Sequence, residues 1–380
     1  MTLPPERAGS ALLVKERELP FSFFPMTRTS RRWGLHSMLY AAEPWAVITG
    51  AIRDAADTRP LTDVEARSAL SFVRQAREYF NAAERAGALE TRPLLYYYSF
   101  LNLGKAIAIA RGRPNMVGKV THGVAADSSF GYLPTTAQLQ LQTSGARSPS
   151  AIAELHLALE GTAMVGRNVR IADLMPQSVV GHRMWRAATG MLRKERFFAL
   201  DEIRWLEDEA AHQIWLKLYL RRDTLQSFAR PVAETLRESG LDPTFRAVND
   251  PDARARGLHT FEQVTPTSYS SGRAADVVMD SVATVRGDIW QTVTATSPFR
   301  RFYLYLSPSN EVRLPQWMTV YTLLFWLGSL TRYQPVELLD NLAGPYGPFF
   351  EEFIETQPAQ LLYFLASEAR QQDVSKPALV

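Results

Sequence analysis

The sequence predicts an α+β fold that is mainly helical, with a small β-sheet region inserted in the middle of the chain. Apolar residues recur at helical spacing in both terminal parts, whereas residues 213–221 alternate strictly between two faces. Hydrophobic residues make up 46% of the chain, which is enough for a substantial core. The length of 380 residues exceeds the usual size of a single domain.

We therefore expect four parts. Residues 1–32, rich in proline and phenylalanine, form an irregular N-terminal arm. A helical region over 33–190, an inserted α+β region with short strands over 191–310, and C-terminal helices over 311–380 complete the chain. The C-terminal helices should pack on the N-terminal helical region, because the apolar face of each needs a partner.

The first helices are predicted from their boundary signals. One helix should run from about Trp33 to Ala56, kinked or split at Pro44. The next begins at Thr62–Glu65, a capping box in which two side chains satisfy free backbone amides, and Gly87 closes it. Its predicted apolar face consists of Val73, Ala76, Tyr79, Phe80 and Ala83.

The segment from Pro93 to Ala110 predicts a helix in the middle of the helical body, because it is apolar nearly all round. Tyr96, Tyr97 and Tyr98 are interpreted as core residues, since base stacking would need an exposed face. Residues 112–147, rich in Gly, Ser, Thr and Pro, predict a long loop that contains Thr121–Gly123. A short helix follows, capped by Ser148-Pro149 and ended by Gly161.

The middle of the chain predicts strands. Gln213–Arg221 has the alternation of a half-buried strand, and Arg301–Leu306 and Glu195–Leu206 are further candidates. Asp223 should cap a helix that runs through Glu238, and residues 240–275 are expected to be irregular.

The C-terminal quarter returns to helix. Pro315 should begin a helix that ends near Tyr333, and Pro335 should begin the next. After a turn at 344–348, two helices are expected over 349–356 and 358–369.

Several classes of chemistry are excluded by what the sequence lacks. The absence of cysteine excludes disulfides, thiolate nucleophiles, iron–sulfur clusters and cysteine-containing zinc sites. The signatures of P-loop, Rossmann, zincin and α/β-hydrolase sites are absent as well. Glu209-x-x-His212 is half of a di-iron motif without its second copy. We therefore expect no cofactor and no metal.

A cytoplasmic protein is expected. The N-terminus has no apolar segment of the kind found in signal peptides. The apolar runs 93–110 and 317–330 are shorter than the roughly 20 residues that cross a bilayer, so no membrane association is predicted.

Three polar residues are candidates for a catalytic site. His122 lies in a glycine-flanked loop and has a side chain that titrates near neutrality, which suits acid–base chemistry. Alternatively, it fixes the loop by a hydrogen bond to the backbone. Lys105 is a candidate nucleophile or anion anchor, or its stem is buried and its head reaches water. Asn102 accompanies it or satisfies a backbone group. We predict that Lys105, Asn102 and the Thr121–Gly123 loop converge.

Three segments carry a family resemblance. Residues 76–105 contain "AREYF" and most of "TRPLLYYYSFLNLGKA", Thr121–Gly123 follows, and "LGSLTRYQP" spans Leu327 to Pro335. Their order and spacing resemble the YaaC-like proteins, a family that implies no established activity. Arg332-Tyr333, within the last segment, is a further possible site, although an arginine at a helix end also complements the helix dipole.

A looser resemblance is to HEPN domains, whose helical pair is followed by a similar Thr-His loop. It makes residues 33–190 HEPN-like and implies a ribonuclease or a part of a toxin or antiviral system. The HEPN signature is an arginine followed by a histidine on a later helix, and the chain departs from it over residues 125–200. Arg31/His36 and Arg254/His259 match the spacing elsewhere, as often as chance predicts for six histidines, and we predict that Arg31 and His36 are not a ribonuclease pair.

Three functions remain open. The leading interpretation is a YaaC-like cytosolic protein that binds RNA or another macromolecule in a stress or antiviral (phage) defence setting; the net charge of only +3 argues against a strong, unspecific nucleic-acid binder. The second is a HEPN-related ribonuclease or other enzyme with a site near His122 and Lys105. The third is a non-catalytic protein that sequesters a partner. An arginine-lined groove would favour RNA binding, and a polar pocket at His122 would favour the enzyme. A large exposed apolar patch would favour sequestration of a partner.

Overall fold

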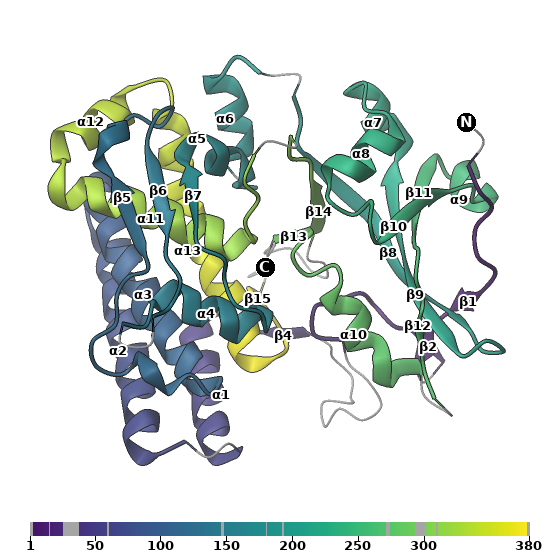
Figure 1. Ribbon diagram of the computed structural model, residues 1–380, viewed down its shortest axis with the longest axis horizontal. Helices are drawn as coiled ribbons and strands as arrows, with labels where there is room; N and C mark the ends of the chain where they lie inside the picture. Colours follow the sequence, from purple (N-terminus) through teal and green to yellow (C-terminus); the bar gives the residue numbers. More distant parts are fainter. Residues whose placement is uncertain are drawn as a thin grey trace. The chain divides into compact units, whose positions relative to one another are not determined.

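A helical unit and a β unit make up the chain in the computed structural model (Figure 1). The helical unit consists of Ala41–Leu192 and Val312–Val374, and the β unit of Met1–Tyr40, Arg193–Glu311 and Ser375–Val380. The fold is mixed α+β with a helical majority. The structure describes residues 3–14, 16–25, 38–58, 61–145, 148–179, 181–191, 194–270, 274–292, 301–308 and 311–377.

The helical unit combines long helices with one small sheet. Its helices are α1 (Pro44–Thr58), α2 (Asp63–Arg85), α3 (Arg92–Ala110), α4 (Ala151–Glu160), α5 (Ile171–Leu174), α6 (His182–Ala188), α11 (Gln316–Tyr333), α12 (Pro335–Ala343) and α13 (Gly347–Arg370). Its antiparallel sheet consists of β5 (Val124–Asp127), β6 (Gln138–Leu141) and β7 (Arg167–Arg170), in that order. Short 3₁₀ turns lie at Leu89–Thr91, Pro114–Met116, Ser128–Phe130 and Met175–Gln177.

Helix α3 is the centre of the helical unit, as its composition predicts. It packs along α2, and the contacts run in opposite directions along the two helices: the Ser99 hydroxyl donates to the Ala76 carbonyl at 2.7 Å, and Tyr96 bonds Glu84 further along. Helix α11 covers another side of α3. The expected antiparallel pair, covered by a helix after residue 315, is confirmed.

Several boundaries in the helical unit differ from the prediction. The first helix begins at Pro44 and is not kinked there, because proline fits the first turn, where its missing N–H is not needed. The predicted residues 33–37 lie outside the described part of the chain. The capping box at Thr62–Glu65 is confirmed, but α2 ends before Gly87, and Ala86 is its C-cap. Tyr79, predicted to be on the apolar face, is 38% exposed.

Two further predictions for the helical unit are wrong: one loop contains strands, and two separate helices are one helix. Residues 112–147 include β5 and β6, strands of four residues that are too short for a periodic signal. The two helices predicted after residue 348 are one continuous helix, α13, with Pro358 inside it. Leu361 and Ile354 are buried on either side of this proline, so packing outweighs the lost backbone hydrogen bond. The cap of α4 is Ser150, whose hydroxyl accepts from the Ala153 amide at 3.2 Å.

The β unit contains one large antiparallel sheet, in the order β10-β11-β9-β8-β14-β13, with β1 on β8 and β12 on β9. Its strands are β1 (Ser10–Ala11), β8 (Phe197–Asp208), β9 (Gln213–Arg221), β10 (Phe245–Val248), β11 (Leu258–Gln263), β12 (Thr267–Ser268), β13 (Ile289–Thr292) and β14 (Arg301–Tyr305). Further short strands of this unit are β2 (Leu13–Val14), β3 (Arg17–Glu18) and β4 (Met38–Tyr40), and the first two residues of β15 (Asp373–Ser375) belong to the helical unit. Its helices are α7 (Arg222–Ser227), α8 (Val232–Glu238), α9 (Pro251–Ala255) and α10 (Val278–Ala283), and a 3₁₀ turn lies at Ala274–Val277.

The three predicted strands are confirmed, but the inserted sheet is larger than expected. Residues 240–275, predicted to be irregular, form β10, β11, β12 and α9. The helix predicted from Asp223 to Glu238 is split into α7 and α8, because Ala229 has a positive φ of 51° and Pro231 cannot continue a helix.

Strand β9 is buried on both faces, not on one. Its residues of even number lie in the main core with the helices of the unit. The opposite face is covered by the N-terminal segment: the Arg7 guanidinium lies 5.0 Å from the centroid of the Trp215 ring, and the Asn249 amide donates to the Pro4 carbonyl at 2.8 Å. The N-terminal arm is therefore not irregular throughout, since it packs on this sheet and pairs with β8.

Lys217, on the covered face of β9, is 2% exposed and ion-paired with Glu6 and, at 3.4 Å, with Asp250. Asp250 also accepts from the Ala253 amide at 2.8 Å, as the N-cap of α9. Burial alone would raise the pKa of Asp250, but the amide and the ammonium outweigh it and hold the pKa below its usual range. Lys217 thus joins the N-terminal segment, β9 and α9 through charge.

We expect Lys217→Met to lower the free energy of unfolding by about 3 kcal/mol or more, because Asp250 would stay buried without a cation. Adding Asp250→Asn should recover part of that loss in urea denaturation at pH 7. Since folding lowers the pKa of Asp250, its carboxylate stabilises the fold above the unfolded value of 3.8, and this contribution is lost as pH falls through the lower folded value. A double variant that is no more stable than the single one would contradict this role.

Candidate functional site

The loop that carries His122 is fixed by backbone contacts with the start of α4. The Thr121 amide donates to the Pro149 carbonyl at 2.9 Å, and the Ala151 amide donates back to the Thr121 carbonyl at 2.9 Å. Gly123 has a φ of +76°, and a Cβ built there would lie 1.8 Å from the Ser150 hydroxyl. Glycine is therefore required at this position for both conformation and space. These contacts on both sides of His122 place the residue beside the start of α4.

Tyr97 orients the His122 imidazole. Its hydroxyl is hydrogen-bonded to Nδ1, and the two rings stack with centroids 5.6 Å apart. Burial raises the pKa of Tyr97, so the phenol keeps its proton at neutral pH. Partial desolvation of the imidazole, followed by the positive charges of Lys105 and Arg332, lowers the pKa of His122. At pH 7 the imidazole is therefore neutral.

Lys105 and Asn102 lie beside α2. The Lys105 ammonium lies 5.4 Å from the centroid of the Phe72 ring, and desolvation lowers the pKa of this lysine. The Asn102 amide donates to Oε1 of Gln75 at 3.5 Å, the limit of a hydrogen bond. The charge of Lys105 lowers the pKa of His122, so these two residues are electrostatically coupled. Asn102 is instead hydrogen-bonded to Gln75 on α2. A catalytic role for the three residues stays a prediction.

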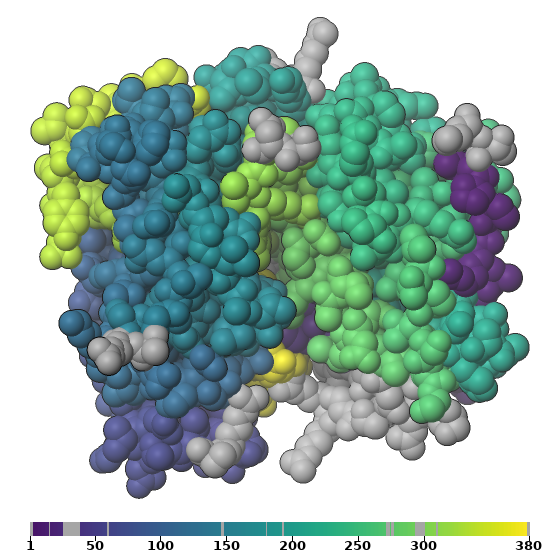
Figure 2. All heavy atoms as spheres, viewed as in Figure 1, coloured from purple at the N-terminus to yellow at the C-terminus, as the bar shows by residue number. Residues whose placement is uncertain are grey.

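Exposed tyrosines lie on the same side of the helical unit as Lys105 and His122, around the half-buried Tyr98. Its ring lies 5.7 Å from that of Tyr79 and 6.4 Å from the imidazole of His122. Arg332, near the end of α11, donates from Nη1 to the Tyr98 hydroxyl at 2.9 Å and lies 4.9 Å from the ring of Tyr333, which is 64% exposed. We call this surface the cationic aromatic face; its residues are Tyr79, Tyr98, Lys105, His122, Arg332 and Tyr333. Helix α12, directly after Tyr333, lies at the surface of the unit (Figure 2, yellow-green).

The charges of the cationic aromatic face are not neutralised by carboxylates. Within the described ranges, neither Lys105 nor Arg332 forms an ion pair, and no carboxylate contributes to the shift in the pKa of Lys105. Both cations instead contact aromatic rings, an arrangement that is attractive in itself and leaves the charge available to an anion.

The sequence indicated part of this face. Arg332-Tyr333 was a possible site, but Tyr79 and Tyr98 were predicted to be buried. A signal for Tyr79 was present, because Phe72, Gln75 and Tyr79 follow helical spacing on a stripe beside the apolar face of α2. Exposure of that stripe depends on where α11 crosses, which the sequence does not specify.

One of the two Arg-x4-His matches lies among the described residues, and it does not form a HEPN-type helical site. Arg31 and His36 lie outside the described residues. Arg254 lies on the short helix α9 and His259 on strand β11, so this match joins a helix end to a strand.

An open polar pocket lies beside the His122 loop. It has a volume of about 720 Å³, and Thr121, Gln140, Gln142 and Arg167 contribute to its lining. His122 is not among the lining residues, so this pocket does not supply the acid–base site that was predicted around that histidine.

Comparison with known proteins supports the family resemblance that the three sequence segments carry. A family described as YaaC-like Protein matches residues 57–369, a range that includes all three segments. No curated protein and no solved structure matches the chain. The looser resemblance to HEPN domains gains no support from these comparisons. Within the described residues, no helix has the length and hydrophobicity to cross a membrane.

The conformation of the His122 loop can be tested with two glycines of similar backbone geometry. Gly123→Ala should lose about 2 kcal/mol more stability than Gly118→Ala, measured by urea denaturation. Both glycines have positive φ, +76° and +95°, but a Cβ meets the Ser150 hydroxyl at the first position and open space at the second. Left-handed backbone costs both variants about 1–2 kcal/mol, and overpacking adds about 1–3 kcal/mol to the first. Equal losses would contradict the close contact between the loop and α4.

Proposed function

The chain belongs to the YaaC-like protein family, and we propose that it binds single-stranded RNA on the cationic aromatic face of its helical unit. One observation carries the proposal: two cations without a described carboxylate partner alternate with tyrosine rings on one surface. Lys105 and Arg332 supply the cations, and Tyr79, Tyr98 and Tyr333 supply the rings.

This combination suits a single strand better than a duplex. Bases of a single strand are free to stack on aromatic side chains, and each such stack contributes about 1–3 kcal/mol. The backbone phosphates need nearby cations, whose counterions are released on binding. Tyr333, the most exposed ring, and Arg332 lie together at the end of α11, so a base and its phosphate can be contacted by neighbouring residues.

The hydrogen bonding of His122 suits binding of a ligand. Nδ1 of its neutral imidazole is already bonded to Tyr97, and Nε2 has no partner among the described residues. A ribose hydroxyl both donates and accepts, so it can bond Nε2 in either tautomer. A ribonuclease or other enzyme near His122 and Lys105 is the second candidate. The observation that supports it is the neutral imidazole of His122, whose pKa is lowered by desolvation and by the charge of Lys105.

A protein partner is the third candidate. Val336 and Leu339 on α12 are 68% and 51% exposed and continue the surface from Tyr333. An apolar stripe of this kind suits a protein that sequesters another. The cations next to it favour RNA as the ligand. The stress or antiviral setting, and the cytoplasmic location, stay predictions.

RNA binding can be measured by fluorescence anisotropy with a labelled single-stranded RNA of about 12 nucleotides. We expect Tyr333→Ala and Arg332→Gln each to weaken binding about 5-fold or more, because each removes one stacking or phosphate contact. Arg332→Gln should also reduce the slope of log affinity against log salt by about 0.7, the value for one phosphate of a single strand.

Two matched variants serve as controls. Arg77→Gln removes the same charge from α2, but this arginine is already paired with Glu43 at 3.3 Å. Tyr40→Ala removes a tyrosine that is 44% exposed and belongs to the β unit. Absence of RNA binding, or equal weakening by the controls, would refute the proposal. Cleavage of the RNA that His122→Ala abolishes would favour the enzyme, and loss of a protein partner in Val336→Asp would favour sequestration.

A further inference from the structure

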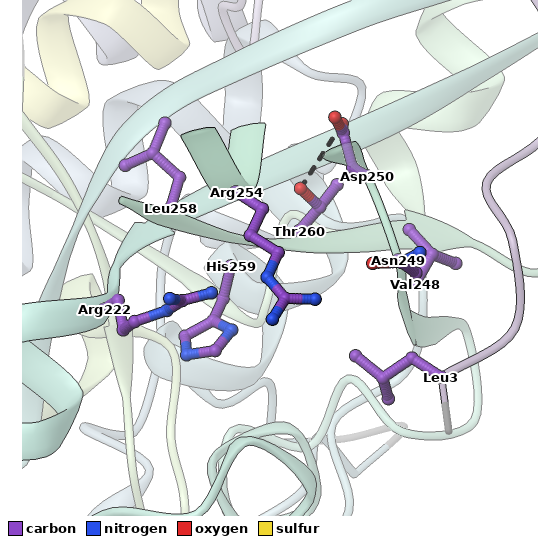
Figure 3. Close-up of a pocket in the computed structure, with 9 residues that line it drawn as sticks. All are labelled: Leu3, Arg222, Val248, Asn249, Asp250, Arg254, Leu258, His259 and Thr260. Atoms are coloured by element: carbon purple, nitrogen blue, oxygen red, sulfur yellow. Dashed lines mark hydrogen bonds between the residues drawn. The ribbon is translucent and has the colours of Figure 1, made fainter. Parts of the chain in front are cut away.

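A separate cationic pocket lies in the β unit. It has a volume of about 320 Å³ and lies where α7, α9 and β11 begin or end (Figure 3). The side chains of Arg222, Arg254 and His259 turn into the same space (Figure 3). Two of these residues, Arg254 and His259, form the Arg-x4-His match that occurs in the sequence no more often than chance predicts.

The backbones of these three residues are held by regular structure. The Arg222 amide donates to the Gly257 carbonyl at 2.9 Å, which ties the start of α7 to the residue before β11. His259 lies within β11, directly opposite Leu220 of β9. The Arg254 amide donates to the Asp250 carbonyl at 2.9 Å within α9. The pocket is therefore preorganised by its backbone, which reduces the entropic cost of binding a ligand.

Positive charge in the pocket exceeds what its carboxylate can balance. Neither Arg222 nor Arg254 forms an ion pair within the described part of the chain. Asp250 also lines the pocket, but its carboxylate accepts from Lys217 at 3.4 Å, the Ala253 amide at 2.8 Å and the Thr260 hydroxyl at 3.4 Å (Figure 3, dashed line). It is thus engaged on the side away from the guanidinium groups.

His259 is neutral at pH 7, because desolvation and then the charge of Arg222 lower its pKa. A neutral imidazole still carries one N–H donor. Two guanidinium forks and one N–H therefore converge on a space whose described carboxylate, that of Asp250, is already engaged by other groups. Leu3, Val248 and Leu258 add apolar contacts to the lining, which suit an organic group attached to an anion.

We propose that this pocket binds a phosphate monoester, with the phosphate between Arg222 and Arg254 and with His259 as a further donor. A monoester carries close to two negative charges at pH 7 and three terminal oxygens, so it matches two arginines better than a carboxylate does. A small phosphorylated metabolite and the 5′-phosphate of an RNA end share this chemistry. The proposal is independent of RNA binding on the cationic aromatic face.

Titration calorimetry tests the pocket with inorganic phosphate, a 5′-mononucleotide, and RNA oligonucleotides that differ only in a 5′-phosphate or 5′-hydroxyl. We expect inorganic phosphate to bind, and Arg222→Gln and Arg254→Gln each to weaken it about 10-fold, the scale of one hydrogen bond to a charged group. Arg256→Gln is the matched control, because this neighbouring arginine is paired with Glu202. The control should bind phosphate as the unaltered chain does.

The two sources of the monoester are separated by the other probes. Tighter binding of the mononucleotide than of phosphate assigns a small metabolite, and a preference for 5′-phosphorylated over 5′-hydroxyl RNA assigns an RNA end. The pocket proposal is overturned if neither phosphate nor any monoester binds, if acetate binds as well as phosphate, or if Arg256→Gln weakens binding as much as Arg254→Gln. Binding of 5′-hydroxyl RNA should be unchanged in Arg254→Gln, so failure of this proposal is distinguishable from failure of the first.

Discussion

Burial of α3 on nearly all sides is the constraint on which the helical unit depends. A helix of this composition is unstable unless neighbours cover it, and α2, α4 and α11 do so from both ends of the sequence. Two glycines allow the close approach: a Cβ at Gly104 would lie 3.0 Å from Leu155, and one at Gly328 would lie 3.3 Å from the Leu94 Cα. These glycines belong to the segments "LNLGKA" and "LGSLTRYQP". The segments that identify the family are therefore explained, at these two positions, by helix packing.

The same packing creates the cationic aromatic face. Tyr97 is buried under α11 and holds His122, whereas Tyr98, the next residue along α3, lies between α2 and the end of α11 and stays half-exposed. Lys105, two turns later, reaches the edge of α2. Where the cover of α3 ends, cations and rings thus replace aliphatic side chains. The site is a consequence of where the neighbouring helices stop.

Local signals in the sequence were sufficient for much of the fold. The capping box at Thr62, the prolines at Pro93 and Pro315, and the strand at Gln213–Arg221 depend on neighbouring residues, and each is confirmed. Apart from the cover of α3 by α11, contacts between distant residues were not predicted. The cover on the second face of β9 comes from residues about 200 positions away, and the strands of four residues are stabilised by pairing partners, not by pattern. Likewise, the exposure of Tyr98 and the convergence of Arg222 with His259 depend on packing across elements.

The central claim is that rings on the cationic aromatic face stack on the bases of RNA. Ultraviolet cross-linking of the full chain to single-stranded RNA, with the linked residues identified by mass spectrometry, tests it without any substitution. The account predicts cross-links at Tyr79, Tyr98 or Tyr333, which are the accessible or half-accessible rings of that face. Cross-links confined to the β unit, or none at saturating RNA, would contradict it.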